Sequence, residues 1–186
     1  MEERIRQAQA GDETAFEQIV AAYAPLAART ALALLHDRAI AEEVVQDTWL
    51  NIWRALPRFD ASRPFRPWLL TIVANSCRMI LRRKALPSVR LEQVGDDLLA
   101  AREDLADHMI RSETDAELTA ALAALPPAQR RLIELRYFAR LEVTEIALVL
   151  AVPEGTVKSR LHRTLAAMRA RLQCNEVLSN RPEVRP

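Results

Sequence analysis

Residues 141–172 read LEVTEIALVLAVPEGTVKSRLHRTLAAMRARL, and this stretch decides the fold of the C-terminal half of the chain. Thr144 and Glu145 open a short predicted helix, and Val152 and Pro153 form a turn. Pro153 suits the start of a second helix, because its missing N–H costs nothing there. The second helix carries one apolar stripe at helical spacing, Val157, Leu161, Leu165, Met168 and Leu172. Two short helices joined by a tight turn predict a helix-turn-helix.

The face opposite this stripe is polar and basic, and it holds the residues that we predict to contact duplex DNA: Thr156, Lys158, Ser159, His162 and Arg163. The major groove admits one helix, and lysine or arginine can donate to guanine N7 and O6. Backbone N–H groups at residues 154–156 can bind a phosphate. From the periodicity alone, a solvated basic face on an ordinary amphipathic helix stays open as the alternative, and so does a bystander role for His162.

The residues before this motif extend it into a family signature. Residues 125–169 resemble region 4 of the extracytoplasmic-function sigma factors, with matches at Leu125-Pro126, Gln129-Arg130, Leu135 to Phe138, Glu145 to Ala147 and Pro153 to Arg160. The resemblance implies that this domain reads the −35 promoter element as a duplex. Ala151 departs from the family pattern, which usually has glycine in this turn. A positive φ there would cost alanine about 1 kcal/mol, so we expect a slightly different turn.

Residues 42–54, EEVVQDTWLNIWR, predict a helix with two distinct faces. One face can pack inward, and it consists of Ile40, Val44, Thr48, Ile52 and Leu56. The other face mixes carboxylates with large apolar groups, which suggests a protein interface. On periodicity alone, simple packing of Trp49 and Trp53 against neighbouring helices is the favoured interpretation. The stretch resembles sigma region 2.2, which docks on the coiled coil of the polymerase β′ subunit, and this implies the core-binding residues Glu43, Gln46, Asp47, Trp49, Leu50 and Trp53.

Residues 59–84, FDASRPFRPWLLTIVANSCRMILRRK, resemble sigma regions 2.3 and 2.4. The resemblance implies the following contacts to the −10 element: Phe65, Arg66, Trp68, Asn75, Arg78, Arg82 and Arg83. The basic helix end suits phosphates, and the loop before Trp68 can hold an extruded base. A solvated basic helix end is the alternative without the family match. Pro64 and Pro67 stiffen this loop relative to the family pattern, which leaves the identity of the recognised base open.

The rest of the N-terminal sequence predicts further helices. An apolar-periodic run follows Gly11-Asp12, and Pro25 is expected to kink or restart that helix before it ends near Leu35. A helix from about Ala39 to Leu56 follows, then a turn-rich loop over residues 58–67 and a last helix from about Trp68 to Lys84.

Charge divides the chain into three parts. Residues 1–84 have 12 basic and 10 acidic groups, residues 85–117 have 3 and 9, and residues 118–186 have 11 and 6. Basic ends around an acidic middle suggest polyanion binding at both ends. We therefore predict an all-α protein with two small helical domains, 1–84 and 113–174, an acidic linker over 85–112 and a polar tail over 175–186. The linker either mimics RNA in the polymerase channels or serves as a solubilising tether.

These features predict a sigma factor whose partners are the β′ and β subunits of core RNA polymerase, promoter DNA and, by family resemblance, an anti-sigma factor. We expect no catalytic residues, no cofactor and no metal site, with Cys77 buried and Cys174 solvated. The histidines His36 and His108 are expected to be solvated or capping residues. The sequence shows no obvious apolar run of about 18 residues and no signal peptide, so we expect a cytoplasmic protein without membrane insertion.

Two other functions stay open. A DNA-binding regulator that acts without polymerase would leave residues 42–83 unexplained. An enzyme that carries a helix-turn-helix, such as a recombinase, would need a nucleophile and acidic residues in a separate catalytic domain, and the chain has no room for one.

Overall fold

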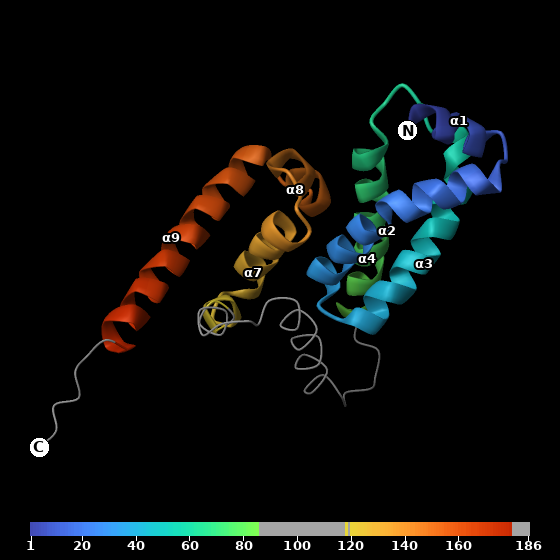
Figure 1. The fold of residues 1–186 in the computed structure, drawn as a ribbon. Helices are drawn as coiled ribbons and strands as arrows, with labels where there is room; N and C mark the ends of the chain where they lie inside the picture. The colour runs from blue at the N-terminus through green and yellow to red at the C-terminus, as the bar shows by residue number, and fades with distance from the viewer. Residues whose placement is uncertain (86–117, 119, 180–186) are drawn as a thin grey trace, which may run out of the picture.

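The structure is a computed structural model that describes residues 1–85, 118 and 120–179 (Figure 1). Its regular elements in this part of the chain are all helical, as predicted: α1 (Glu2–Gln9), α2 (Glu13–Leu35), α3 (Arg38–Ala55), the 3-10 turn η1 (Leu56–Arg58), α4 (Phe65–Ala85), α7 (Pro127–Ile133), the π-helical turn η2 (Glu134–Phe138), α8 (Val143–Leu150) and α9 (Glu154–Ser179). Of the predicted linker over 85–112, Ala85 is the last residue of α4, and the rest lies outside the described residues, as do residues 113–117 of the predicted second domain.

Helices α1 to α4 form an N-terminal bundle in which α2 packs against the other three. Asp12 and Asp37 begin α2 and α3 by accepting hydrogen bonds from backbone N–H groups three residues on, at 3.0 and 2.9 Å. Helix α1 was not predicted, because only Ile5 and Ala8 of this polar segment are buried. Gln9 holds α1 in place by donating to two backbone carbonyls at the start and just after the end of η1, those of Leu56 and Phe59.

Two helix boundaries correct the sequence prediction. Helix α2 continues through Pro25 without a restart. Pro25 and Ala21, whose carbonyl loses its helical partner, both lie on the exposed side of α2, where water can replace the lost hydrogen bond. Helix α4 begins at Phe65, three residues before the predicted Trp68. Pro67 is compatible with this start because the first turn of a helix has no use for its N–H.

Helix α2 also bears on the expectation about membranes. We expected no apolar run of spanning length, but α2 is long and apolar enough to cross a membrane by length and composition alone. Ile19, Ala27 and Ala31 are fully buried in the bundle, and α1, α3 and α4 surround this helix. The core helix of a helical bundle passes the same composition test, so length and composition alone are weak evidence for a membrane span.

Helices α7 to α9 form a C-terminal bundle that contains the predicted helix-turn-helix. The turn keeps a left-handed residue at Ala151, with φ 55° and ψ 47°, so the expected change of shape is not observed. The second helix is not short: α9 extends to Ser179, since residues 156–181 contain neither glycine nor proline. Figure 1 shows the C-terminal bundle beside α4, with α8 against it and α9 extending away.

Candidate polymerase and nucleic-acid interfaces

Helix α3 separates its two predicted faces as the sequence indicates. Val44, Thr48 and Ile52 are buried in the N-terminal bundle. On the other side, the candidates Glu43, Gln46 and Asp47 are exposed, and Leu50 is 57% exposed. A large apolar side chain this open to solvent and ringed by polar groups is a candidate for contact with another protein.

The two tryptophans of this face are half-buried and pack against α2. The ring of Phe16 lies 6.2 Å from that of Trp49 and 4.7 Å from that of Trp53, between centroids. Such aromatic pairs stabilise the packing of α2 on α3 by about 0.5–1.5 kcal/mol each beyond simple burial. The packing interpretation is therefore confirmed for both indoles, and their role in core binding stays a prediction.

An aromatic cluster fixes the start of α4. Phe65 is only 4% exposed, and its ring contacts those of Tyr23, Phe59 and Trp68 at centroid distances of 5.2, 5.6 and 5.4 Å. Trp68 is half-buried and also lies 4.6 Å from Phe59. Because Phe65 is buried, its ring is part of the core, and a bound base could contact only the edge of the ring.

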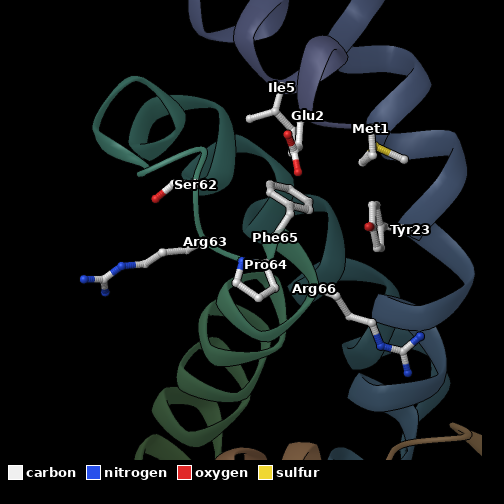
Figure 2. Close-up of a pocket in the computed structure, with 9 residues that line it drawn as sticks. All are labelled: Met1, Glu2, Ile5, Tyr23, Ser62, Arg63, Pro64, Phe65 and Arg66. Atoms are coloured by element: carbon white, nitrogen blue, oxygen red, sulfur yellow. The ribbon is translucent and has the colours of Figure 1, made fainter.

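A cavity of about 360 Å³ opens beside this cluster, between α1, α2 and the loop that leads into α4 (Figure 2). Its volume is within the range of small-ligand sites. Figure 2 shows the rings of Tyr23 and Phe65 side by side at the cavity and tilted to one another, while Arg63 points away. Its lining combines apolar and polar groups: Met1, Glu2, Ile5, Tyr23, Ser62, Arg63, Pro64, Phe65 and Arg66.

Two arginines predicted to contact DNA form hydrogen bonds with the C-terminal bundle. Arg66 binds Glu145 of α8 through two hydrogen bonds, Nε to Oε1 at 2.5 Å and Nη2 to Oε2 at 3.0 Å. Burial alone would raise the pKa of Glu145, but hydrogen bonds from Arg66 and from the Glu142 backbone N–H outweigh it and lower that pKa. Arg78 donates to the Val149 carbonyl at 2.6 Å, at the end of α8.

The other predicted −10 residues are exposed. Asn75 accepts a hydrogen bond of 2.6 Å from Arg78, which orients the guanidinium toward α8. Arg82 and Arg83 lie exposed near the end of α4, where positive charge also complements the helix dipole. The structure therefore divides this set into side chains within the fold and a solvent-exposed basic end.

A second contact between the bundles joins His36 to Glu134 of η2, with Nδ1 3.4 Å from Oε2. His36 ends α2 in the left-handed conformation, so it is a capping residue as expected, and it is half-buried. Burial, helped by Arg131 and Arg130, lowers the pKa of His36 to about 4. Burial raises the pKa of Glu134 to about 7, although the same two arginines oppose the rise. Glu134 was missed because a lone acidic residue in a helical pattern gives no sign of burial.

The predicted −35 residues lie on one side of α9. Lys158, Ser159, His162 and Arg163 are exposed, and Thr156 is half-buried at the first turn. Their interactions are with α9 itself: Ser159 donates to the Thr156 carbonyl at 3.1 Å, and Lys158 lies 4.0 Å from Glu154. The opposite stripe is buried at Val157, Leu161 and Met168, as the spacing predicts.

Comparison with known proteins agrees with this two-bundle arrangement. Residues 19–86 match Sigma-70 region 2, and residues 115–168 match Sigma-70 region 4. The RNA polymerase sigma-H factor of Pseudomonas aeruginosa is 30% identical over 177 residues, which cover 91% of this chain and 92% of that protein. The ECF RNA polymerase sigma factor SigL of Mycobacterium tuberculosis is 33% identical over 172 residues, covering 91% and 96%.

The chain therefore belongs to the extracytoplasmic-function sigma factors, the DNA-binding initiation factors of RNA polymerase. It directs transcription initiation at specific promoters. Among solved structures, CnrH in complex with the cytosolic domain of CnrY is similar, with a TM-score of 0.63 and 28% identity, covering 93% of this chain and 97% of that one.

Proposed function

We propose that this sigma factor divides its work among three surfaces. The exposed face of α3 binds core polymerase, the start of α4 with its cavity reads the −10 element, and α9 reads the −35 element. The observation that carries the proposal is Leu50, which lies exposed among carboxylates on a helix whose other face is fully committed to the core. In this scheme the N-terminal domain spans residues 1–84 and the C-terminal domain 113–174, except that α4 and α9 extend past these ends to Ala85 and Ser179, so that α9 runs into the predicted tail.

The α3 surface offers the chemistry of a specific protein interface. Leu50 supplies apolar area at its centre, and the outer sides of Trp49 and Trp53 extend that area. The carboxylates of Glu43 and Asp47 form a polar rim that favours a basic partner surface. Because Phe16 already fixes both indoles, little side-chain entropy is lost when a partner binds.

The cavity beside α4 fits an extruded base of the −10 element. Tyr23 offers an aromatic ring for stacking, which is sequence-tolerant and contributes about 1–3 kcal/mol per base, and Phe65 adds an apolar contact. Ser62 and Glu2 supply hydrogen-bonding groups that can distinguish one base edge from another. Arg82 and Arg83 remain free to contact the phosphates that follow.

Helix α9 is suited to the duplex. Its exposed Lys158 and Arg163 are about one and a half turns apart with Ser159 and His162 between them, an arrangement that reaches base edges and phosphates in a major groove. In this scheme the chain itself is not an enzyme, because the chemistry of transcription belongs to the core polymerase. It acts in the cytoplasm, where core polymerase and chromosomal DNA are found.

We also propose that an anti-sigma factor controls this protein by covering the α3 surface. CnrH, which is similar over nearly the whole chain, was solved with a bound partner domain. The α3 surface is the exposed apolar site that such a partner would need to cover to block polymerase. An anti-sigma complex that leaves Leu50 accessible to polymerase would contradict this assignment.

The test is run-off transcription from a selected promoter library with bacterial core polymerase. We expect specific initiation that requires the protein and is lost in Asp47→Asn with Leu50→Ala. Both side chains are exposed, so this pair should fold normally, unlike changes at Trp53. Glu17→Gln, an exposed change of equal charge on α2, is the control and should initiate normally. No initiation, with tight operator binding by the protein alone, would identify a free-standing DNA-binding regulator instead.

A further inference from the structure

Two arginines of α4, Arg66 and Arg78, form hydrogen bonds with α8, one near each end of that helix. Arg66 and Arg78 are separated by twelve residues, or about 18 Å along a helix. Arg66 reaches Glu145 in the first turn of α8, and Arg78 reaches the Val149 carbonyl in its last turn. The C-terminal end of a helix carries partial negative charge, so both ends of α8 present negative groups to α4. We call this contact the α4–α8 interface.

The ion pair between Arg66 and Glu145, at the first turn of α8, has the geometry of a strong interaction. The guanidinium and the carboxylate meet in a bidentate geometry, and the Glu145 side chain is only 11% exposed while that of Arg66 is 40% exposed. A third hydrogen bond, of 3.3 Å, runs from Arg66 to the Arg140 carbonyl. Partial burial of a bidentate pair makes it stronger than an ordinary surface ion pair.

The groups that α8 supplies resemble what a DNA strand would supply. Carboxylate and carbonyl oxygens accept the same guanidinium hydrogen bonds as phosphate and base oxygens. Both arginines belong to the set that the sequence predicts to contact the −10 element. The Nε–Nη2 edge of Arg66 that holds Glu145 cannot bind a phosphate at the same time.

We propose that α8 is an internal competitor of the −10 strand, and that the α4–α8 interface holds the free protein in a closed state. This inference rests on the proposed function. In the closed state Arg66 and Arg78 of α4 are engaged, while Arg82 and Arg83 at its end and the cations of α9 stay exposed. Binding of the −10 strand then requires α8 to leave, and the affinity for that strand is lowered by the fraction of molecules that are closed.

The experiment uses the full chain and weakens the interface without touching the proposed DNA contacts. Glu145→Gln removes the charge that binds Arg66, yet its amide oxygen can still accept from the Glu142 backbone N–H and keep the cap of α8. The matched control is Glu142→Gln. Glu142 shares the capping box and pairs with Arg136 inside the C-terminal bundle, so this control loses the same charge from the same turn.

Two readouts are compared. Dyes on Arg29→Cys and Arg169→Cys, both exposed sites, report the distance between the bundles by energy transfer, with Cys174→Ser throughout and the buried Cys77 left in place. Binding of a short single-stranded DNA of randomised sequence reports access to α4. We expect Glu145→Gln to lower the transfer efficiency and to bind the single strand about fivefold more tightly. Glu142→Gln should match the parent in both.

The outcomes separate this inference from the proposed function. Unchanged energy transfer and unchanged single-strand binding in Glu145→Gln, in a protein that supports run-off transcription, would overturn the closed state and leave the sigma function standing. Equal gains in both variants would mean that single-strand binding follows net charge, which also overturns the inference. Opening by Glu145→Gln in a protein that never initiates would support the interface and count against the proposed function.

Discussion

The two surfaces proposed to bind DNA differ in what their cations contact within the free chain. On α4, Arg66 and Arg78 are hydrogen-bonded to α8 of the other bundle. On α9, Lys158 and Arg163 are exposed, and their interactions stay within their own helix. A positively charged side chain at a predicted DNA contact can therefore already be bound within the protein. Replacing arginine or lysine by alanine should change DNA binding differently on the two surfaces.

The largest expected effect separates the surfaces by duplex binding of the free protein. Lys158→Ala with Arg163→Ala should weaken binding to mixed-sequence duplex DNA about tenfold or more and make its dependence on salt shallower by about two phosphate contacts. Arg66→Ala with Arg78→Ala removes the same charge, yet should change duplex binding little, because α8 occupies both groups. Fluorescence anisotropy over a salt series measures this. Equal losses of duplex affinity in the two double variants would show that the cations of the two surfaces are equally accessible to DNA, contrary to this prediction.

A second prediction concerns the buried pair His36 and Glu134, which joins the bundles beside α2. The pKa of Glu134 is raised to about 7 in the folded chain, so its contribution to stability is present at low pH and lost as pH rises from about 4.5 to about 7. The pKa of His36 is lowered to about 4, so its contribution is lost as pH falls from about 6.5 to about 4. The two groups change the free energy of unfolding in opposite directions as pH rises. In the parent protein these changes should nearly cancel between about pH 4 and pH 7.

Single substitutions should expose each slope. In Glu134→Gln only His36 still titrates, so the free energy of unfolding should rise with pH. In His36→Asn only Glu134 still titrates, so the free energy of unfolding should fall with pH; asparagine tolerates the left-handed conformation of this cap. Each change in the free energy of unfolding is about 1–3 kcal/mol across the range, measured by urea titration at several pH values. Arg130 and Arg131 face the pair and stay in place in both variants. Parallel pH profiles in all three proteins would contradict the opposed shifts.

The sequence predicted the two bundles because their signals are local. The apolar stripe of α9 and the inner face of α3 repeat at helical spacing, and burial at Val157 and Ile52 confirms both. The contacts between bundles were not predictable in this way. Arg66 and Glu145 are 79 residues apart, and each belongs to a local pattern that gives it another role, a DNA contact and a helix start. Which side chains of the two bundles form ion pairs depends on how the bundles pack together, and the spacing of residues along the chain does not predict that packing.

The smallest expected effect lies at Ala151, the residue that joins the engaged helix α8 to the free helix α9. Its left-handed backbone, at φ 55°, is costly for alanine and free for glycine. Ala151→Gly should raise the free energy of unfolding by about 1 kcal/mol or somewhat less, because glycine also gains entropy in the unfolded chain. Thermal and urea denaturation measure the gain, and Ala166→Gly, an exposed site within α9, is the control and should destabilise by a similar amount. Since the turn keeps its shape, energy transfer between the bundles and duplex binding should both stay at the parent values. A gain in stability that also opened the α4–α8 interface would mean that strain at this turn helps to press α8 against α4.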